Sequence, residues 1–170
     1  MRRINNPNGV ASLNRPIMSQ SLSQVHVHLV FSTRNRVPFL RNNELRIEMH
    51  NYLGGVSNQH HCPIIRVGGA EDHVHLIAVL GREVSQANWV RDLKRASSAW
   101  VKGRFNEKGV DNFAWQTGYG CFAVGVDCLP KVVLYVETQM EHHKKTGFQD
   151  EYRTILTQLG MTWDERYVWD

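Results

Sequence analysis

Four segments of the chain carry apolar and β-branched residues in the short runs that are typical of strands. The first, SQVHVHLVFST at 23–33, alternates along its length. The segment PIIRVGGA at 63–70 ends in two glycines, and HVHLIAVL at 73–80 follows almost at once, so these two predict a hairpin. A later segment, FAWQTGYGCFAVGV at 113–126, predicts a strand whose glycines mark bends or bulges.

Apolar residues at helical spacing predict four helices between and after these strands. The first follows Pro38 and ends at Gly54-Gly55, and the second covers 85–105 with Ser85 as its N-cap. A third runs through CLPKVVLYVETQMEHHKKTG at 128–147, and FQDEYRTILTQLG at 148–160 forms the last.

The predicted order is therefore β-α-β-β-α-β-α-α. Its first six elements match the split pattern of a ferredoxin-like or RRM-like α+β fold, an antiparallel sheet with helices on one face. Residues 1–17 are rich in Asn, Arg, Gly and Pro, which predicts a loose N-terminal tail. Residues 18–170 are then expected to form a single domain, for which a hydrophobic content of 42% supplies a core.

Composition narrows the setting in which the protein works. No apolar run is long enough to cross a membrane, and the N-terminus lacks the apolar stretch of a secretory signal, so no membrane partner is expected. The three cysteines form no CxxC pair, which favours a reducing cytoplasm over a disulfide scaffold or a thiolate zinc site.

The basic residues are unevenly distributed, although the net charge of +4 is by itself a weak signal. No acidic residue precedes Glu44, and the helix at 85–105 carries a basic stripe at spacings of i, i+3, i+4 and i+11. The stripe comprises Arg91, Lys94, Arg95 and Lys102. A solvated helix face is the plain interpretation, and contacts with a polyanion such as nucleic acid are the functional one.

Two identical His-Val-His triplets lie in predicted strands, one at 26–28 and the other at 73–75. Histidines at i and i+2 of a strand point to the same face, so either pair could hold a metal ion. The second pair follows Glu71-Asp72, whose carboxylates could orient the imidazoles. For His26 and His28 we expect a structural or supporting role.

Tyr135 and Gln139 lie four residues apart on the third predicted helix and so share a face. The plain interpretation is a core aromatic and a surface amide. The functional one is a phenol nucleophile beside an amide oxygen that binds a hard cation. Tyr119 is a rival nucleophile, but no residue of ligand type lies four positions after it.

Taken together, the HVH strand, LKRASSAWV, WQTGYGCFAV, YVETQMEHHKKTGFQDEY and ERYVWD resemble the IS200/IS605-type transposases over roughly residues 20–170. These are single-tyrosine transposases that act on single-stranded DNA and carry an HUH motif, two histidines flanking a hydrophobic residue. The YxxxQ segment with the following HH is far more specific than HxH alone.

The resemblance implies an HUH-nuclease type of fold and an enzyme that cleaves and rejoins single-stranded DNA through a 5′-phosphotyrosine intermediate. It implies His73, His75 and Gln139 as ligands of Mg²⁺ or Mn²⁺, and Tyr135 as the catalytic nucleophile. The basic stripe would contact DNA, with hairpin-forming ends as the recognised substrate. Members of the family are homodimers, in which the tyrosine helix can complete the site of the partner subunit in trans.

Two other functions fit parts of the pattern. A domesticated relative would use the same site to bind or nick repeated genomic palindromes without mobilising its own gene, and only the DNA flanking the gene separates this case from a transposase. A pure RRM-like binding module would need exposed aromatics on its central strands, and of the two HVH strands only 23–33 offers one, Phe31.

Overall fold

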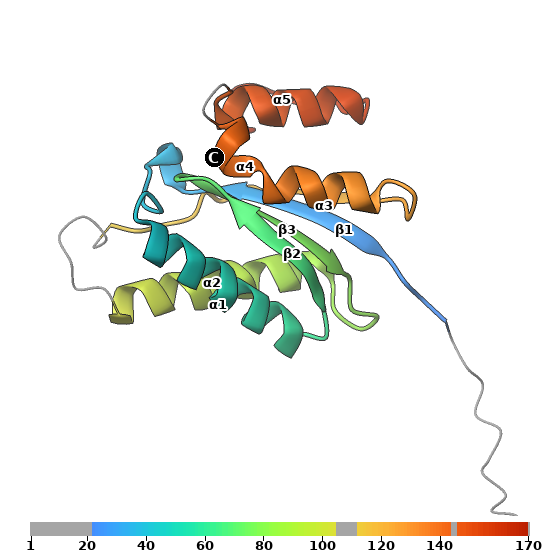
Figure 1. Cartoon of the computed structure of the whole chain (residues 1–170), viewed down its shortest axis with the longest axis horizontal. Helices are drawn as coiled ribbons and strands as arrows, with labels where there is room; N and C mark the ends of the chain where they lie inside the picture. Colours follow the sequence, from blue (N-terminus) through green and yellow to red (C-terminus); the bar gives the residue numbers. More distant parts are fainter. Residues whose placement is uncertain (1–21, 105–111, 144–145, 170) are drawn as a thin grey trace, which may run out of the picture.

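The computed structural model describes residues 22–104, 112–143 and 146–169 of the chain (Figure 1). At its centre is a four-stranded sheet with the order β2-β3-β1-β4, in which every pair is antiparallel. The strands are β1 (His26–Ser32), β2 (Ile64–Gly69), β3 (His73–Val79) and β4 (Gly120–Ala123). This is the predicted α+β fold, and the predicted hairpin is the β2–β3 pair.

The two strands that carry the His-Val-His triplets are the central pair of the sheet. All seven residues of β1 are buried, and β3 is buried from His73 to Ala78. Their register sets Val30 opposite His75 and His28 opposite Ile77, so His28 and His75 are diagonal neighbours. Because side chains alternate along a strand, the histidines of both triplets project from the same face of the sheet.

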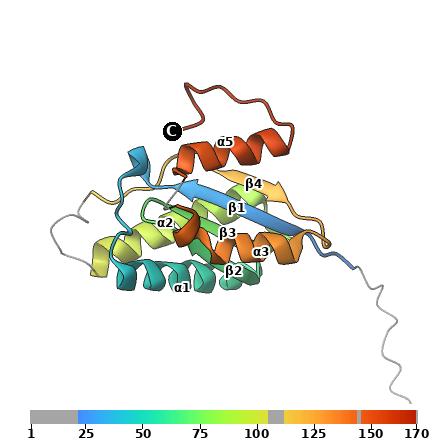
Figure 2. The ribbon, with the colours of Figure 1, turned by 45° about the horizontal axis from the view of Figure 1, so that its top comes forward.

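Two helices, α1 (Asn43–Gln59) and α2 (Gln86–Arg104), cover the other face (Figures 1 and 2). The main hydrophobic core lies between them and the odd-numbered residues of β1 and even-numbered residues of β3, such as Leu29 and Leu76. The predicted N-cap is present, since Ser85 Oγ accepts a hydrogen bond from the Asn88 amide at 3.2 Å.

Three C-terminal helices lie on the histidine face: α3 (Leu129–Glu137), α4 (Gln139–His142) and α5 (Phe148–Gln158). Helix α3 packs on β2 and β3. A second, smaller core joins α5 to β1 and β4 through Val30, Phe122, Phe148, Tyr152 and Leu156. The predicted pair of helices on one face is thus correct for α1 and α2, and the C-terminal helices enclose the other face.

Three element boundaries differ from the sequence prediction. Helix α1 runs through Gly54-Gly55 because its last turn is anchored by buried Val56 and Ser57, and packing outweighs the low helix propensity of glycine. The segment 113–126 pairs as a strand only over β4, with one further bridge between Thr33 and Trp115. The predicted long helix is broken at Thr138, whose ψ of 12° departs from helical geometry.

The predicted tail at 1–17 lies outside the described residues. Among the residues that the structure describes, no helix combines the length and the hydrophobicity needed to cross a membrane.

Candidate functional site

The His73–His75 pair opens β3 and is completely buried, with exposed fractions of 0% for both residues. Asp72 orients the first imidazole, since its Oδ1 lies 2.7 Å from His73 Nδ1. This is one of the two carboxylates that the sequence suggested for the task. The other, Glu71, is instead paired with Arg41 at the surface. With Nδ1 engaged by Asp72, the Nε2 atom of His73 faces the interior of the site.

The second imidazole is oriented by the other His-Val-His triplet. His28 Nε2 lies 2.9 Å from His75 Nδ1, and the two rings are stacked with centroids 5.1 Å apart. For His75 to bind an ion through Nε2, its Nδ1 must carry the proton and donate it to His28, and this contact accommodates that tautomer. The Nε2 atom of His75 is buried and has no hydrogen-bond partner, which is the setting expected of a metal-ligand atom. His26 instead contacts Gln24 through its Nε2 at 3.2 Å.

Burial favours the uncharged form of the His28 and His75 imidazoles. It lowers the pKa of His28 to about 4, and it lowers the pKa of His75 well below the usual value, an effect to which His73 and His28 add by charge repulsion. A neutral imidazole is the form that binds a metal ion.

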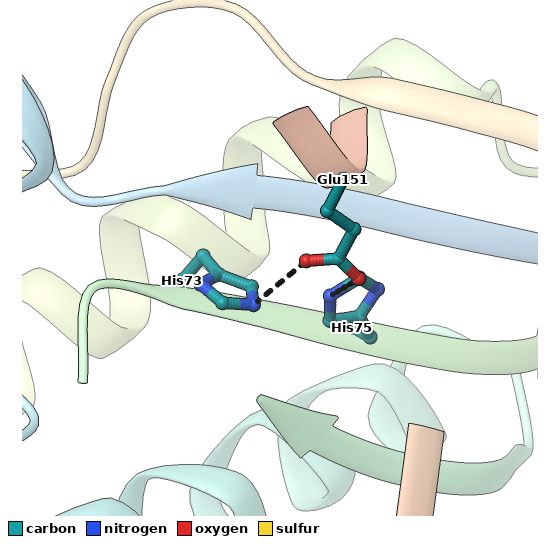
Figure 3. Close-up of side chains that lie close together, drawn as sticks. All are labelled: His73, His75 and Glu151. Carbon is teal, nitrogen blue, oxygen red and sulfur yellow. Dashed lines mark ion pairs between the residues drawn. The ribbon is translucent and has the colours of Figure 1, made fainter. Parts of the chain in front are cut away.

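A carboxylate from α5 completes the cluster, as Figure 3 shows. Glu151 Oε1 lies 3.4 Å from His75 Nε2, and Glu151 Oε2 lies 3.6 Å from His73 Nε2. The ligand atoms of the three residues all lie within 4.8 Å of one another. Burial, with a smaller contribution from Asp72, raises the pKa of Glu151 to about 8.

Tyr135 and Gln139 reach the same carboxylate from α3 and α4. The Tyr135 hydroxyl donates a hydrogen bond to Glu151 Oε1, and Gln139 Nε2 donates to the same oxygen at 2.8 Å. The amide oxygen of Gln139 lies 3.5 Å from His73 Nε2. The four residues singled out in the sequence, His73, His75, Tyr135 and Gln139, therefore converge within one chain.

His143 also belongs to the cluster, since its Nε2 lies 2.5 Å from Glu151 Oε2. Burial lowers the pKa of His143 to about 4, with His73 adding to the effect. Burial thus disfavours the charged form of both partners in this contact.

The donor set fits a divalent cation. Two imidazole nitrogens and one carboxyl group form a compact buried group, with the Gln139 amide oxygen beside it. The orphaned Nε2 of His75 supports this use most directly, because a buried acceptor without a partner costs free energy unless something binds it. Combinations of imidazole and carboxylate oxygen bind several divalent metals, so the donors alone leave the identity of the ion open.

Glu151 and His143 were missed as site residues by the sequence analysis. Glu151 lies in the first turn of α5 beside Asp150, where acidic residues are common in any helix because they interact favourably with its dipole. Nothing in its neighbourhood sets it apart from a surface carboxylate. The signal that could have found it is its burial, which depends on how α5 packs across the sheet.

The basic stripe on α2 borders a groove on the opposite side of the sheet. A cavity of about 370 Å³ lies between this helix and residues 113–119, and all four basic residues of the stripe line it. Arg91 and Arg95 are exposed and share Asp92, and Lys102 is exposed as well. These three side chains can therefore reach a ligand in the groove.

Lys94 has a different setting from the rest of the stripe. Its Nζ donates to the carbonyl oxygens of Gln116, Thr117 and Gly118 at 2.6–3.2 Å. Burial lowers its pKa to about 8. Lys94 thus ties the 116–118 segment to α2. Tyr119 lies on this side of the molecule too, with the Lys94 amine 5.6 Å from its ring, so it is not part of the histidine cluster.

Comparison with known proteins supports one family. The family model described as "Transposase IS200 like" matches residues 21–139. A search of curated sequences found no match. Among solved structures, a protein assigned as a transposase from Deinococcus radiodurans R1 is 19% identical, with a TM-score of 0.56 over 72% of this chain and 98% of that one.

A REP-associated tyrosine transposase, solved with a bound REP hairpin, is 16% identical to this chain. Its TM-score is 0.50, over 71% of this chain and 72% of that one. At these identities the two structures speak for the fold alone, whereas the family model covers most of the chain. This protein therefore belongs to the IS200-like transposase family.

Proposed function

We propose that the protein is a metal-dependent transposase that cleaves and rejoins single-stranded DNA, with Tyr135 as the nucleophile. The observation that carries this proposal is the contact of Tyr135 with Glu151 in the same buried cluster as His73 and His75. A phenol, two imidazoles and a carboxyl group brought together from three separate elements have no need of one another in a purely structural core. They match the groups that a phosphoryl transfer needs.

In the proposed reaction the Tyr135 oxygen attacks the scissile phosphorus. The bond from phosphorus to the 3′ oxygen of the preceding nucleotide breaks, which leaves a 5′-phosphotyrosine and a free 3′-OH. With a cation bound beside it, Glu151 would be ionised, and the phenol proton would pass first towards its Oε1, the acceptor that the hydroxyl already contacts. The leaving 3′ oxygen takes up a proton in turn, so the step consumes and releases one proton each. Attack by another 3′-OH on the phosphotyrosine reverses the step, so strands are rejoined without a further energy source.

We infer that His73 and His75 hold the divalent ion through Nε2, and that Glu151 or Gln139 supplies an oxygen. Bound there, Mg²⁺ or Mn²⁺ would polarise the scissile phosphate and stabilise the charge that develops on its oxygens. Asp72 and His28 fix the orientation of the two rings, which is the usual task of residues behind metal-binding histidines.

The α2 groove is proposed to hold the DNA backbone. Arg91, Arg95 and Lys102 present positive charge along it, and phosphate contacts of this kind position a substrate without reading its sequence. The REP-associated relative was solved with a hairpin bound, and we propose a hairpin-forming end as the ligand of this chain too. The homodimer that the resemblance implies stays a prediction. Tyr135 lies beside the histidines of its own chain, so one chain holds every member of the cluster.

The test uses single-stranded DNA from the flanks of the gene, incubated with protein in Mg²⁺ or Mn²⁺ and separated under denaturing conditions. The wild type should form a covalent protein–DNA adduct that disappears in Tyr135→Phe and after chelation of the metal. Tyr119→Phe is the matched control and should retain the adduct. An adduct that persists in Tyr135→Phe would show that another group is the nucleophile.

A further inference from the structure

A second cavity lies beside the histidine cluster, and the proposed reaction assigns no ligand to it. It has a volume of about 630 Å³ and lies between α3, β4 and α5. His28, Tyr135 and Glu151 form its boundary with the cluster. A ligand in this cavity would therefore lie against the attacking tyrosine, within the chain that carries it.

The inner wall of the cavity is aromatic and apolar. The rings of His28 and Phe122 meet edge to face with centroids 6.5 Å apart, and Tyr135 stands edge-on to His28 at 6.4 Å. Val132 of α3 and Ile155 of α5 form the opposing apolar sides. This combination suits a flat, aromatic group better than an extended alkyl chain.

Among the residues that the structure describes, the mouth of the cavity is lined by polar side chains and an exposed lysine. Thr154 and Gln158 of α5 are exposed there and offer hydroxyl and amide groups that both donate and accept hydrogen bonds. Lys131 of α3 lies across from them, also exposed. A ligand with an aromatic plane, polar edges and a nearby negative charge matches these three features together.

We infer that this cavity receives one unpaired nucleobase from the DNA strand, next to the scissile phosphate. The volume is within the range of about 300–1,000 Å³ that is common for pockets of small ligands, and stacking on side-chain rings is how single-stranded bases are usually bound. Lys131 would contact the phosphate of the nucleotide that carries this base. A base that is paired in a duplex cannot enter, so the cavity selects single-stranded DNA at the site of attack.

This inference rests on the proposed function, and its test has two independent parts. The first asks whether isolated deoxynucleoside 5′-monophosphates bind to chelator-treated protein, followed by saturation-transfer NMR. Thr154→Trp fills the mouth of the cavity from an exposed position. Thr157→Trp is the control: it lies on the same helix, is also exposed, bonds its own i−4 carbonyl in the same way, and does not line the cavity.

We expect the base protons of at least one nucleotide to receive saturation from the wild type and from Thr157→Trp, and the signal to be lost in Thr154→Trp. Equal signals in both variants, or none in any protein, would overturn the inference. A loss of dimers in Thr154→Trp alone, measured by size-exclusion chromatography with light scattering, would overturn it as well, because it would assign the cavity to a second copy of the chain.

The second part replaces single bases of a cleaved strand by abasic sites, one position at a time. One position beside the scissile phosphate should slow adduct formation at least about fivefold in the wild type, since stacking of a base is worth about 1–3 kcal/mol. In Thr154→Trp the same abasic site should have no further effect. A uniform response along the strand contradicts the inference. Nucleotide binding without any adduct would instead refute the proposed function and leave the cavity assignment standing.

Discussion

At the scale of single residues, the hydrogen bond between His28 and His75 determines which nitrogen of a central ligand faces the ion. His75 can bind an ion through Nε2 only if its proton stays on Nδ1, and His28 Nε2, 2.9 Å away, is then the acceptor that holds it there. The two triplets are therefore not alternatives for one task. The triplet of β1 supports the triplet of β3, and the antiparallel register of the two strands brings them together.

We predict that His28→Phe weakens metal binding about 10- to 100-fold, the usual cost of losing a group that orients a ligand. The aromatic ring keeps the space filled while the hydrogen bond to His75 disappears. Titration of Mn²⁺ followed by calorimetry measures the effect. His26→Phe, two residues away on the same face of β1, is the control and should bind Mn²⁺ like the wild type. Equal affinities in both variants would refute the role of His28.

How much of the site the sequence could reveal depends on the kind of signal each residue leaves. His73 and His75 form a short local motif, and Tyr135 and Gln139 share a helix-like spacing, so local patterns with the family resemblance found all four. The link from His28 to His75 needs the strand register. Glu151 can be recognised as a site residue only once the packing of α5 on the sheet is known. In the sequence it lies beside Asp150 in a first helical turn, where acidic residues are common.

At the scale of elements, the position of α3 relative to β2 depends on the absence of a side chain at Gly68. A Cβ at this position would lie 2.2 Å from the carbonyl oxygen of Val136, the residue after Tyr135. The helix that carries the nucleophile therefore rests directly on the backbone of an edge strand. Such a close approach fixes how far the Tyr135 hydroxyl extends towards the cluster.

Gly68→Ala is expected to move α3 outwards, to lower the free energy of unfolding by about 1–3 kcal/mol and to slow adduct formation more than tenfold. Urea denaturation and the adduct assay measure the two effects. The control is Gly54→Ala in α1, where a Cβ meets nothing within 4 Å and a gain of about 0.5–1 kcal/mol is expected. An active Gly68→Ala would show that the spacing between α3 and β2 is not critical.

The kind and order of the elements were predictable because each has a clear hydrophobic period, whereas their ends were not. Helix α1 continues past two glycines because the buried side chains after them fit the core. The break at Thr138 divides a segment whose sequence shows no glycine or proline at that point. For α1, packing of its buried side chains in the core, which local sequence does not contain, decided where the helix ends.

At the scale of the whole molecule, the two faces of the sheet carry different tasks. The cluster lies under α3 and α5, while the basic groove lies along α2. Figures 1 and 2 show these helices on opposite faces of the sheet. Backbone contacts that hold the DNA are thus separated from the groups that react with it. Substitutions in the α2 groove should therefore leave the geometry of the histidine cluster largely intact, and the reverse should also hold.

If Arg91, Arg95 and Lys102 bind phosphates, replacing all three by glutamine should weaken DNA binding and reduce its salt dependence. On a hairpin stem, the slope of log K against log salt should become shallower by about 0.9 for each phosphate that is no longer neutralised, and on single-stranded DNA by about 0.7. Fluorescence anisotropy at several salt concentrations measures the slope. Lys94→Met is the contrasting variant: it should lower stability by about 1–3 kcal/mol, because the three carbonyl oxygens no longer have their donor, with little change in slope. An unchanged slope in the triple variant would show that the α2 groove does not bind the DNA backbone.

The buried titratable groups predict that the metal-free protein is most stable near pH 6.5. The pKa values of His28, His50 and His143 are lowered from 6.5 to about 4, so the folded protein binds fewer protons than the unfolded chain in that interval and loses stability as the pH falls. The pKa of Glu151 is raised from 4.5 to about 8, so above pH 6.5 its effect dominates and stability falls as the pH rises.

Thermal denaturation in chelator across this pH range measures both limbs. Glu151→Gln should abolish the decline between pH 6.5 and 8 and keep the decline on the acid side. A variant that retains the alkaline decline would show that Glu151 is not the group responsible.

The position of Glu151 also bears on how this protein can be shortened. The segment that matches the family model ends at Gln139, and Glu151 and His143 both lie after it. A chain cut at that boundary would keep the tyrosine and both triplets, and would still be recognised as a family member by its sequence. It would lose α5, the smaller core and the only carboxylate in the described metal cluster. The part of the chain that identifies the family thus ends at Gln139, whereas the part that supplies the side chains of the cluster extends to Glu151.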